Sequence, residues 1–218
     1  NINTPDKKLD YLINNWLLYE VLSCRIYGRS AFYQVSGAFG FRDQLQDVMS
    51  LIYSNPDIAR DHIILCCAHQ FREGDVQHWW HYPSGVGVRT KISDDRLWIP
   101  YVVSYYIEKT GDTEILNVEV PYLEMQNLQP HEDSIYAIPN ISEEKGNVLD
   151  HCMRAVNSSL KFGIHGLPLI GSGDWNDSLN SVGDEGKGES IWLAWFTLAT
   201  LSEFIKVLEK INRKEDVD

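Results

Sequence analysis

The chain has 218 residues and a formal net charge of −12, which comes from 19 basic and 31 acidic side chains. This excess of negative charge argues against binding to nucleic acid or to an anionic membrane, because both require basic surfaces. Hydrophobic residues make up 44% of the chain, which is enough for one sizeable core. Neither an uninterrupted apolar run of ~18 residues nor a signal-peptide pattern occurs, so we expect no membrane contact.

Apolar residues recur at intervals of three and four over most of the chain, which is the spacing of an amphipathic helix. The first such stretch predicts a helix over residues 5–27 that starts at Thr4-Pro5-Asp6. A second helix should end near Asn55. Further helices are expected over residues 56–71, 96–110, 146–161 and 189–210, with a short one from Thr113.

Two segments break the helical pattern. Residues 126–146 are polar and predict a surface excursion, and residues 211–218 are expected to form a frayed tail. No series of strands joined by hairpin turns is evident. Helix pairs joined by long polar and aromatic loops therefore predict an all-α fold, a toroid of helices whose loops gather at one end.

The four cysteines favour reduced thiols. Cys66 and Cys67 are adjacent in the apolar run IILCCAHQF, which suits neither a CxxC metal site nor a simple disulfide pattern. Packed, unpaired thiols are typical of a reducing compartment, so the sequence predicts a cytoplasmic location.

The segment Gly166–Glu189 reads GLPLIGSGDWNDSLNSVGDEGKGE and contains six glycines. Each glycine costs about 1 kcal/mol inside a helix or strand relative to alanine, so a loop is expected. Loops of this length are uncommon in compact domains and are usually functional or disordered. Apolar residues such as Trp175 argue against disorder. The sequence therefore predicts an active-site loop.

Carboxylates, tryptophans and glycines together suit sugar chemistry, because carboxylates bind hydroxyl groups and indole faces stack on pyranose rings. Cleavage of a glycosidic bond also requires a carboxylic acid to protonate the leaving oxygen. In the DWND motif, repulsion between Asp174 and Asp177 would keep one of them protonated. The alternative is that both cap the turns of a glycine-rich loop.

Other charged clusters allow two interpretations. Asp94-Asp95 would either cap a helix or enter the site, and Arg42 with Asp43 and Asp47 would either form an exposed ion-pair network or bind a ligand. His78 and His81 resemble no metal motif, and no phosphate-binding glycine motif occurs, so neither a metal nor a nucleotide is predicted.

Six segments, spread in order over nearly the whole chain, resemble glycoside hydrolase family 94, the inverting β-glucoside phosphorylases. FRDQLQD and GDVQHWWH are similar to members that act on β-1,2-glucans. The segments are GAFGFRDQLQD (37–47), QFREGDVQHWWH (70–81), GVRTKISDDRLWIPY (87–101), TGDTEIL (110–116), HGLPLIGSGDWND (165–177) and GKGESIW (186–192).

The resemblance implies that residues 1–218 are part of a catalytic (α/α)6 barrel in which Asp177 is the general acid. It implies a β-glucooligosaccharide and inorganic phosphate as substrates, no cofactor, α-glucose 1-phosphate as product, and a homodimer as the full-length form. The substrate-binding residues implied by position are Arg42, Asp47, Trp175, Asp174, Trp79, Trp80, Asp94, Asp95 and Glu189.

The chain departs from the family pattern in two respects. The family usually has DWNDGMN where this chain has Ser178, which requires a backbone without positive φ. Family members are also several times longer, and their phosphate-binding loop has no counterpart here, so we expect a partial chain. Two alternatives stay open: a non-catalytic sugar-binding fragment, and an inverting hydrolase with a base ~6.5–9.5 Å from the acid, for which Asp47, Asp94 and Asp95 are candidates.

Overall fold

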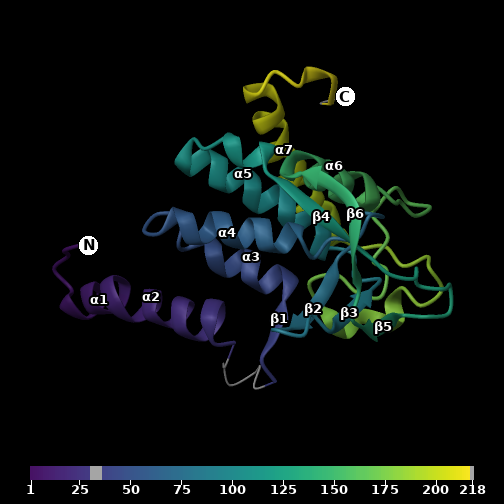
Figure 1. The fold of residues 1–218 in the computed structure, drawn as a ribbon, viewed down its shortest axis with the longest axis horizontal. Helices are drawn as coiled ribbons and strands as arrows, with labels where there is room; N and C mark the ends of the chain where they lie inside the picture. Colours follow the sequence, from purple (N-terminus) through teal and green to yellow (C-terminus); the bar gives the residue numbers. More distant parts are fainter. Residues whose placement is uncertain (30–35, 217–218) are drawn as a thin grey trace.

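A computed structural model describes residues 1–29 and 36–216 of the chain (Figure 1). Helices account for 49% of the described residues, and strands with isolated bridges account for 19%. The structure is therefore mixed α/β, and the prediction of an all-α (α/α)6 toroid is wrong. A four-stranded and a two-stranded antiparallel sheet lie in segments that were expected to be loops.

The predicted N-terminal helix is confirmed as one continuous helical segment over residues 7–27. Its carboxylate cap is Asp6, which accepts hydrogen bonds from the backbone N–H groups of Lys8 and Leu9. Part of the loop expected after this helix falls on residues 30–35, outside the described residues. The segment comprises α1 (Lys7–Tyr11), η1 (Leu12–Trp16), α2 (Leu17–Glu20) and η2 (Val21–Tyr27).

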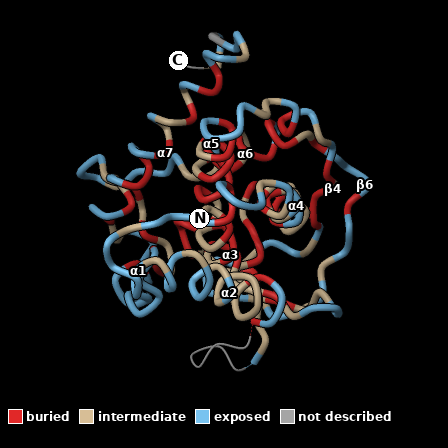
Figure 2. The backbone as a smooth tube through the Cα atoms, turned by 90° about the vertical axis from the view of Figure 1, so that its left-hand side faces the viewer, coloured by how far each residue is buried: buried red, intermediate tan, exposed pale blue. Residues whose placement is uncertain are grey.

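Five helices enclose the core, and they lie close to their predicted positions (Figure 2). Their ends carry the expected signals, such as the Asn147–Asp150 capping box that opens α6 and Gly111, with φ of 77°, after α5. Trp98 of α5 packs on Phe196 of α7 with ring centroids 4.5 Å apart. The helices are α3 (Phe41–Met49), α4 (Pro56–Cys67), α5 (Trp98–Thr110), α6 (Val148–Ser159) and α7 (Ile191–Lys210).

The four-stranded sheet joins segments far apart in sequence, in the order β1 (Ala38–Gly40), β2 (Gln77–His81), β3 (Gly87–Thr90) and β5 (Ser134–Ala137). All three pairings are antiparallel. The two-stranded sheet pairs β4 (Glu119–Glu124) with β6 (Asn140–Asn147). Residues 126–146 therefore contain β5 and most of β6.

The glycine-rich loop lies against residues 91–93. Gly171, with φ of 63°, forms an isolated bridge with Ile92, and the Ser93 N–H donates to the Gly173 carbonyl at 2.9 Å. A Cβ atom on Gly171 would collide with the Lys91 carbonyl oxygen. Glycine is thus required here both for the backbone angle and for the close approach. The 3-10 helices η3 (Asp95–Leu97) and η5 (Asp177–Val182) follow the two segments of this contact, and η4 (Glu114–Asn117) and η6 (Lys214–Asp216) follow α5 and α7.

Within the described ranges, α7 is the one helix long and apolar enough to cross a membrane. Length and composition alone are weak evidence for a span, because core helices of globular domains meet the same criterion. One face of α7 packs into the core through Leu193, Phe204 and Leu208.

Candidate active site

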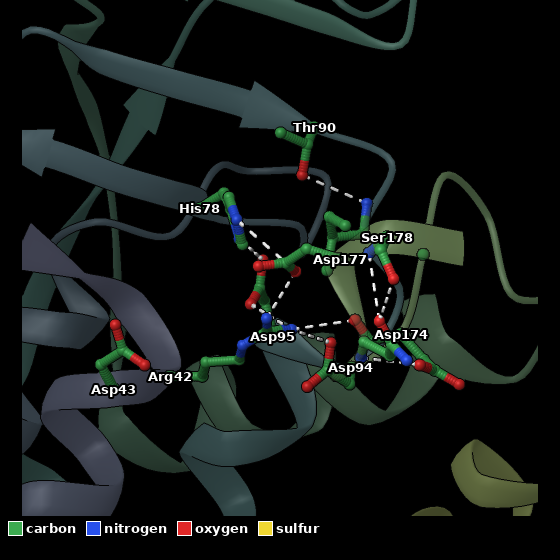
Figure 3. Close-up of polar contacts among 12 residues, drawn as sticks. Arg42, Asp43, His78, Thr90, Asp94, Asp95, Asp174, Asp177 and Ser178 are labelled. Atoms are coloured by element: carbon green, nitrogen blue, oxygen red, sulfur yellow. Dashed lines mark hydrogen bonds and ion pairs between the residues drawn. The ribbon is translucent and has the colours of Figure 1, made fainter. Parts of the chain in front are cut away.

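Arg42 connects three segments that are distant in sequence (Figure 3). It lies in the first turn of α3, and its side chain is only 8% exposed. Its Nη1 donates to Asp94 Oδ1 at 2.8 Å and to the Asp174 carbonyl oxygen at 3.0 Å. Its Nη2 donates to Asp177 Oδ1 at 2.5 Å. The guanidinium group therefore fixes the DWND motif relative to α3 and η3.

Asp94 anchors the buried side of Arg42. Its side chain is fully buried and accepts a second hydrogen bond, from Trp98 Nε1 at 3.1 Å. Its side chain makes no capping hydrogen bond at the N-terminus of η3, so it binds Arg42 and does not cap the helix. Burial and the neighbouring Asp95 raise the pKa of Asp94 to about 7, although the Arg42 charge opposes this shift.

His78 is a second cation beside the DWND motif. Its Nδ1 donates to Asp95 Oδ2 at 2.8 Å, and its Nε2 lies 4.0 Å from Asp177 Oδ1. Burial lowers the pKa of His78, but the Asp95 carboxylate outweighs it and raises the value to about 9. Asp95 is 2% exposed, and its Oδ1 has no hydrogen-bond partner among the described residues. This oxygen lies 3.9 Å from Arg42 Nη1.

Asp174 anchors the loop. It is 4% exposed, and its carboxylate accepts from the Asn176 N–H at 2.9 Å and from Ser190 Oγ at 2.6 Å. Ser190 is also the N-cap of α7, since its Oγ accepts from the Leu193 N–H at 2.9 Å. Asp174 thus ties the DWND turn to the start of α7, which agrees with the turn-capping alternative for this residue.

Asp177 has a different environment. Its side chain is 58% exposed, and one carboxylate oxygen binds Arg42, whose guanidinium carbon lies 6.0 Å from the centroid of the Trp175 ring. Asp177 stands at the edge of a pocket of about 390 Å³. The pocket is lined by Ser36, Ala38, Gly40, Arg42, Asp43, His78, Trp79, His81 and Asp177.

The two tryptophans of β2 lie in different environments. Trp79 lines the pocket. Trp80 is 3% exposed and stacks on His69 with ring centroids 3.6 Å apart, so it belongs to the core. Successive side chains of a strand point to opposite faces of the sheet, which accounts for the difference.

Of the substrate-binding residues implied by the resemblance, Arg42 and Trp79 line this pocket, whereas Asp47 and Glu189, like Asp94, Asp95, Asp174, Trp175 and Trp80, do not. Asp47 binds Arg25 Nε at 2.8 Å, and burial raises its pKa. Glu189 accepts from His165 Nδ1 at 2.6 Å and from the His165 N–H at 3.0 Å. Its carboxylate holds the turn before the glycine-rich loop.

The structure adds pocket residues that sequence reasoning assigned differently or left aside: His78, His81, Asp43 and Gly40. His78 and His81 belong to β2, which has a bulge between Gln77 and Trp79, whereas Gly40 and Asp43 lie at the start of α3. In the described ranges, no group of three or more His, Cys, Asp or Glu side chains is placed to hold a metal ion.

Ser178 fits its position without strain. Among the described residues, only Arg29 and Asn212 are non-glycine residues with positive φ. The Ser178 N–H and Oγ both donate to Asn176 Oδ1, at 3.2 and 2.6 Å. Asn176 is therefore the N-cap of η5, and Ser178 donates a second, side-chain hydrogen bond to it where the family pattern has glycine.

Comparison with known proteins finds a glucan synthase and several carbohydrate phosphorylases among the relatives of this chain. The cyclic beta-(1,2)-glucan synthase NdvB of Rhizobium meliloti (strain 1021) is 46% identical over 94% of this chain and 7% of its own length. Solabiose phosphorylase of Paenibacillus borealis is 33% identical over 98% of this chain and 24% of its own length. The 1,2-beta-oligoglucan phosphorylase of Listeria innocua is 26% identical over 81% of this chain and 16% of its own length.

The chain thus spans a quarter or less of the length of these three relatives. A family model described as the glycosyl hydrolase 94 superfamily, catalytic domain, matches residues 1–218, the whole of the chain. This match confirms the resemblance seen in the sequence. The chain belongs to the glycosyl hydrolase 94 superfamily and corresponds to part of its catalytic domain.

Proposed function

We propose that this chain carries the acid and sugar-binding site of an inverting phosphorolysis of β-1,2-linked glucooligosaccharides, with Asp177 as the general acid. The observation that supports it most is the contact between Arg42 and Asp177 at the edge of the pocket lined by Trp79. It combines an accessible carboxyl group with buried charges that fix its position and an indole for the sugar.

The proposed chemistry requires one protein carboxyl group. The Asp177 carboxyl transfers its proton to the glycosidic oxygen as the bond from that oxygen to the anomeric carbon breaks. An oxygen of inorganic phosphate attacks the anomeric carbon from the opposite face. The products are α-glucose 1-phosphate and a glucan one unit shorter, and general acid catalysis of this kind is worth about 10²–10⁴ in rate.

The surroundings of the candidate bases favour phosphate over water as the nucleophile. An inverting hydrolase needs a second carboxylate that activates water across the sugar. Asp94 and Asp95 are buried and bind Arg42 and His78, and Asp47 binds Arg25. None of the three lines the pocket.

The β-1,2 linkage is supported by the names of two relatives, the cyclic beta-(1,2)-glucan synthase and the 1,2-beta-oligoglucan phosphorylase. We further propose a cytoplasmic protein that acts as a homodimer in its full-length form. Three free cysteines buried in the described structure, Cys66, Cys67 and Cys152, suit a reducing compartment.

The test is to incubate the full-length protein with β-1,2-glucooligosaccharides and phosphate and to measure α-glucose 1-phosphate. Wild type should form it only when phosphate is present, and Asp177→Asn should be slower by about 10²–10⁴. Asp184→Asn, at an exposed position of the same loop, is the matched control and should behave as wild type. Release of glucose without phosphate would contradict the proposal and indicate hydrolysis.

A further inference from the structure

A row of side chains crosses the four-stranded sheet from the pocket to its edge. Trp79 of β2 pairs with Val88 of β3, and Val88 pairs with Tyr136 of β5. The rings of Trp79 and Tyr136 have centroids 5.6 Å apart and an interplanar angle of 46°. Tyr136 is 59% exposed. Residues paired across neighbouring strands point to the same face, so the two rings form one surface.

This row is continuous with the pocket of Asp177. In β1, Gly40 pairs with Trp79, and both residues line the pocket. His81 also lines the pocket and packs edge-on against Trp79, with ring centroids 5.3 Å apart. A ligand that begins at Asp177 and passes Trp79 therefore meets Tyr136 next.

The segment before β5 is attached to β3, which places Tyr136 at this edge. Lys91, which follows β3, donates from Nζ to the Pro130 carbonyl oxygen at 2.9 Å. Residues 134–137 then add the edge strand of the sheet, with all four paired in register to β3. Within β5, Tyr136 is exposed whereas Ile135 and Ala137 are half-buried. The segment that reads as a surface excursion thus contributes a ring to this face.

We propose that Trp79 and Tyr136 form a platform that binds glucosyl units beyond the one held at Asp177, so that the site accepts oligosaccharides. Uncharged rings with polar edges suit sugars, whose apolar faces stack on aromatic rings while their hydroxyl groups reach Tyr136 Oη and His81. The tilt between the rings means that the bound units are turned relative to each other. This inference rests on the proposed function for the identity of the sugar.

The experiment compares kcat/KM of the full-length protein for β-1,2-glucans from the disaccharide to the hexasaccharide. Wild type should gain efficiency with chain length. In Tyr136→Ala, the rise in kcat/KM from the disaccharide to the hexasaccharide should be about tenfold smaller than in wild type, which corresponds to ~1.4 kcal/mol. Tyr136→Phe should retain most of this rise. Tyr53→Ala is the control, because Tyr53 is 69% exposed and contacts Tyr105 on the helical side of the molecule.

Two results would overturn the platform: a Tyr136→Ala variant with the chain-length dependence of wild type, or one that loses the same factor on every chain length. Calorimetric titration with the same glucans separates this inference from the proposed function. If wild type forms no glucose 1-phosphate, affinity that rises with chain length and falls in Tyr136→Ala still supports the platform. Affinity independent of chain length overturns it.

Discussion

Arg42 shows how a buried charge organises the site. Taking a guanidinium group out of water is costly unless opposite charges surround it, and here Asp94 binds it at 2.8 Å and Asp177 at 2.5 Å. These partners raise the pKa of Arg42 although burial opposes them. Because Asp94 is fully buried while Asp177 is 58% exposed, the arginine links the core to the open pocket. The exposed carboxyl group is therefore held at the place where a substrate can reach it.

His78 should make the stability of the protein depend on pH in the alkaline range. Its pKa in the folded protein is about 9, against 6.5 for the free side chain, so its ion pair with Asp95 is fully present below pH 6.5. That stabilisation is lost as the pH rises through 9, since the imidazole loses its charge. The difference corresponds to roughly 3 kcal/mol.

Urea unfolding of wild type and His78→Gln between pH 6 and pH 10 tests this effect. The difference in unfolding free energy should be largest near pH 6 and should shrink through pH 9. The charges facing His78 are Asp95, Asp177 and Arg42, and the substitution preserves all three. His131→Gln, at an exposed position, should show no such trend. A difference that stays constant with pH would mean that His78 is uncharged at neutral pH.

At the residue scale, local motifs predict which residue types gather but not what each one touches. The DWND motif and FRDQLQD point to Asp177 and Arg42, which the structure brings together. Asp174 and Asp177 have different environments because their partners differ. Asp174 binds Ser190, which is 16 residues away in sequence. Asp177 binds Arg42, which is 135 residues away. Burial of Trp80 next to a pocket-lining Trp79 depends on strand geometry that the sequence pattern did not reveal.

At the scale of elements, the glycine-rich loop depends on a close contact with the segment that follows β3. Gly171 and Gly186 both have positive φ, 63° and 70°, but only at Gly171 would an added Cβ atom collide with a backbone oxygen. This pair of glycines separates the cost of the backbone angle from the cost of the lost contact.

Gly186→Ala should therefore destabilise the protein by roughly 1–2 kcal/mol, the cost of the left-handed conformation. Gly171→Ala should destabilise the protein by this amount and by about a further 1–3 kcal/mol, because the loop must move away from Lys91. It should also reduce kcat, since the movement shifts the DWND turn. Thermal unfolding and steady-state kinetics of the two variants measure both effects. Equal losses of stability and of kcat in the two variants would show that the close contact of Gly171 with Lys91 contributes nothing to either.

Helices were predictable in this chain, and strands were not. Helix patterns are local, so the apolar spacing within α4 or α7 was sufficient to predict each of these helices. The strands of the larger sheet have at most five residues, and except for the hairpin of β2 and β3 their partners lie far away in sequence. β1 pairs with β2 across about 40 residues, and β3 pairs with β5 across about 50. No short window contains both halves of such a pair, and the glycines around them favoured a loop interpretation.

At the scale of the molecule, α7 exposes an apolar face. Ile191, Trp195 and Leu198 lie at helical spacing on one side and are 65, 68 and 56% exposed. Exposed patches of this kind usually mark a contact surface. We expect a second copy to cover this face when the 218-residue chain is isolated.

The isolated chain should therefore self-associate, and Trp195→Glu should shift it toward the monomer by placing a charge in the apolar face. Light scattering coupled to size-exclusion chromatography at several concentrations measures the mass. Gln126→Glu adds the same charge at an exposed position away from α7 and is the control. A wild-type chain that stays monomeric at all concentrations would contradict this prediction.

The proposed transfer of a proton from Asp177 to the leaving oxygen is tested most directly by a substrate that needs no proton. Fluoride leaves unprotonated, so the reaction of β-glucosyl fluoride with phosphate should survive Asp177→Asn in the full-length protein. Phosphorolysis of the oligosaccharide should fall by about 10²–10⁴ in the same variant. If the variant loses both reactions equally, or neither, then Asp177 is not the general acid.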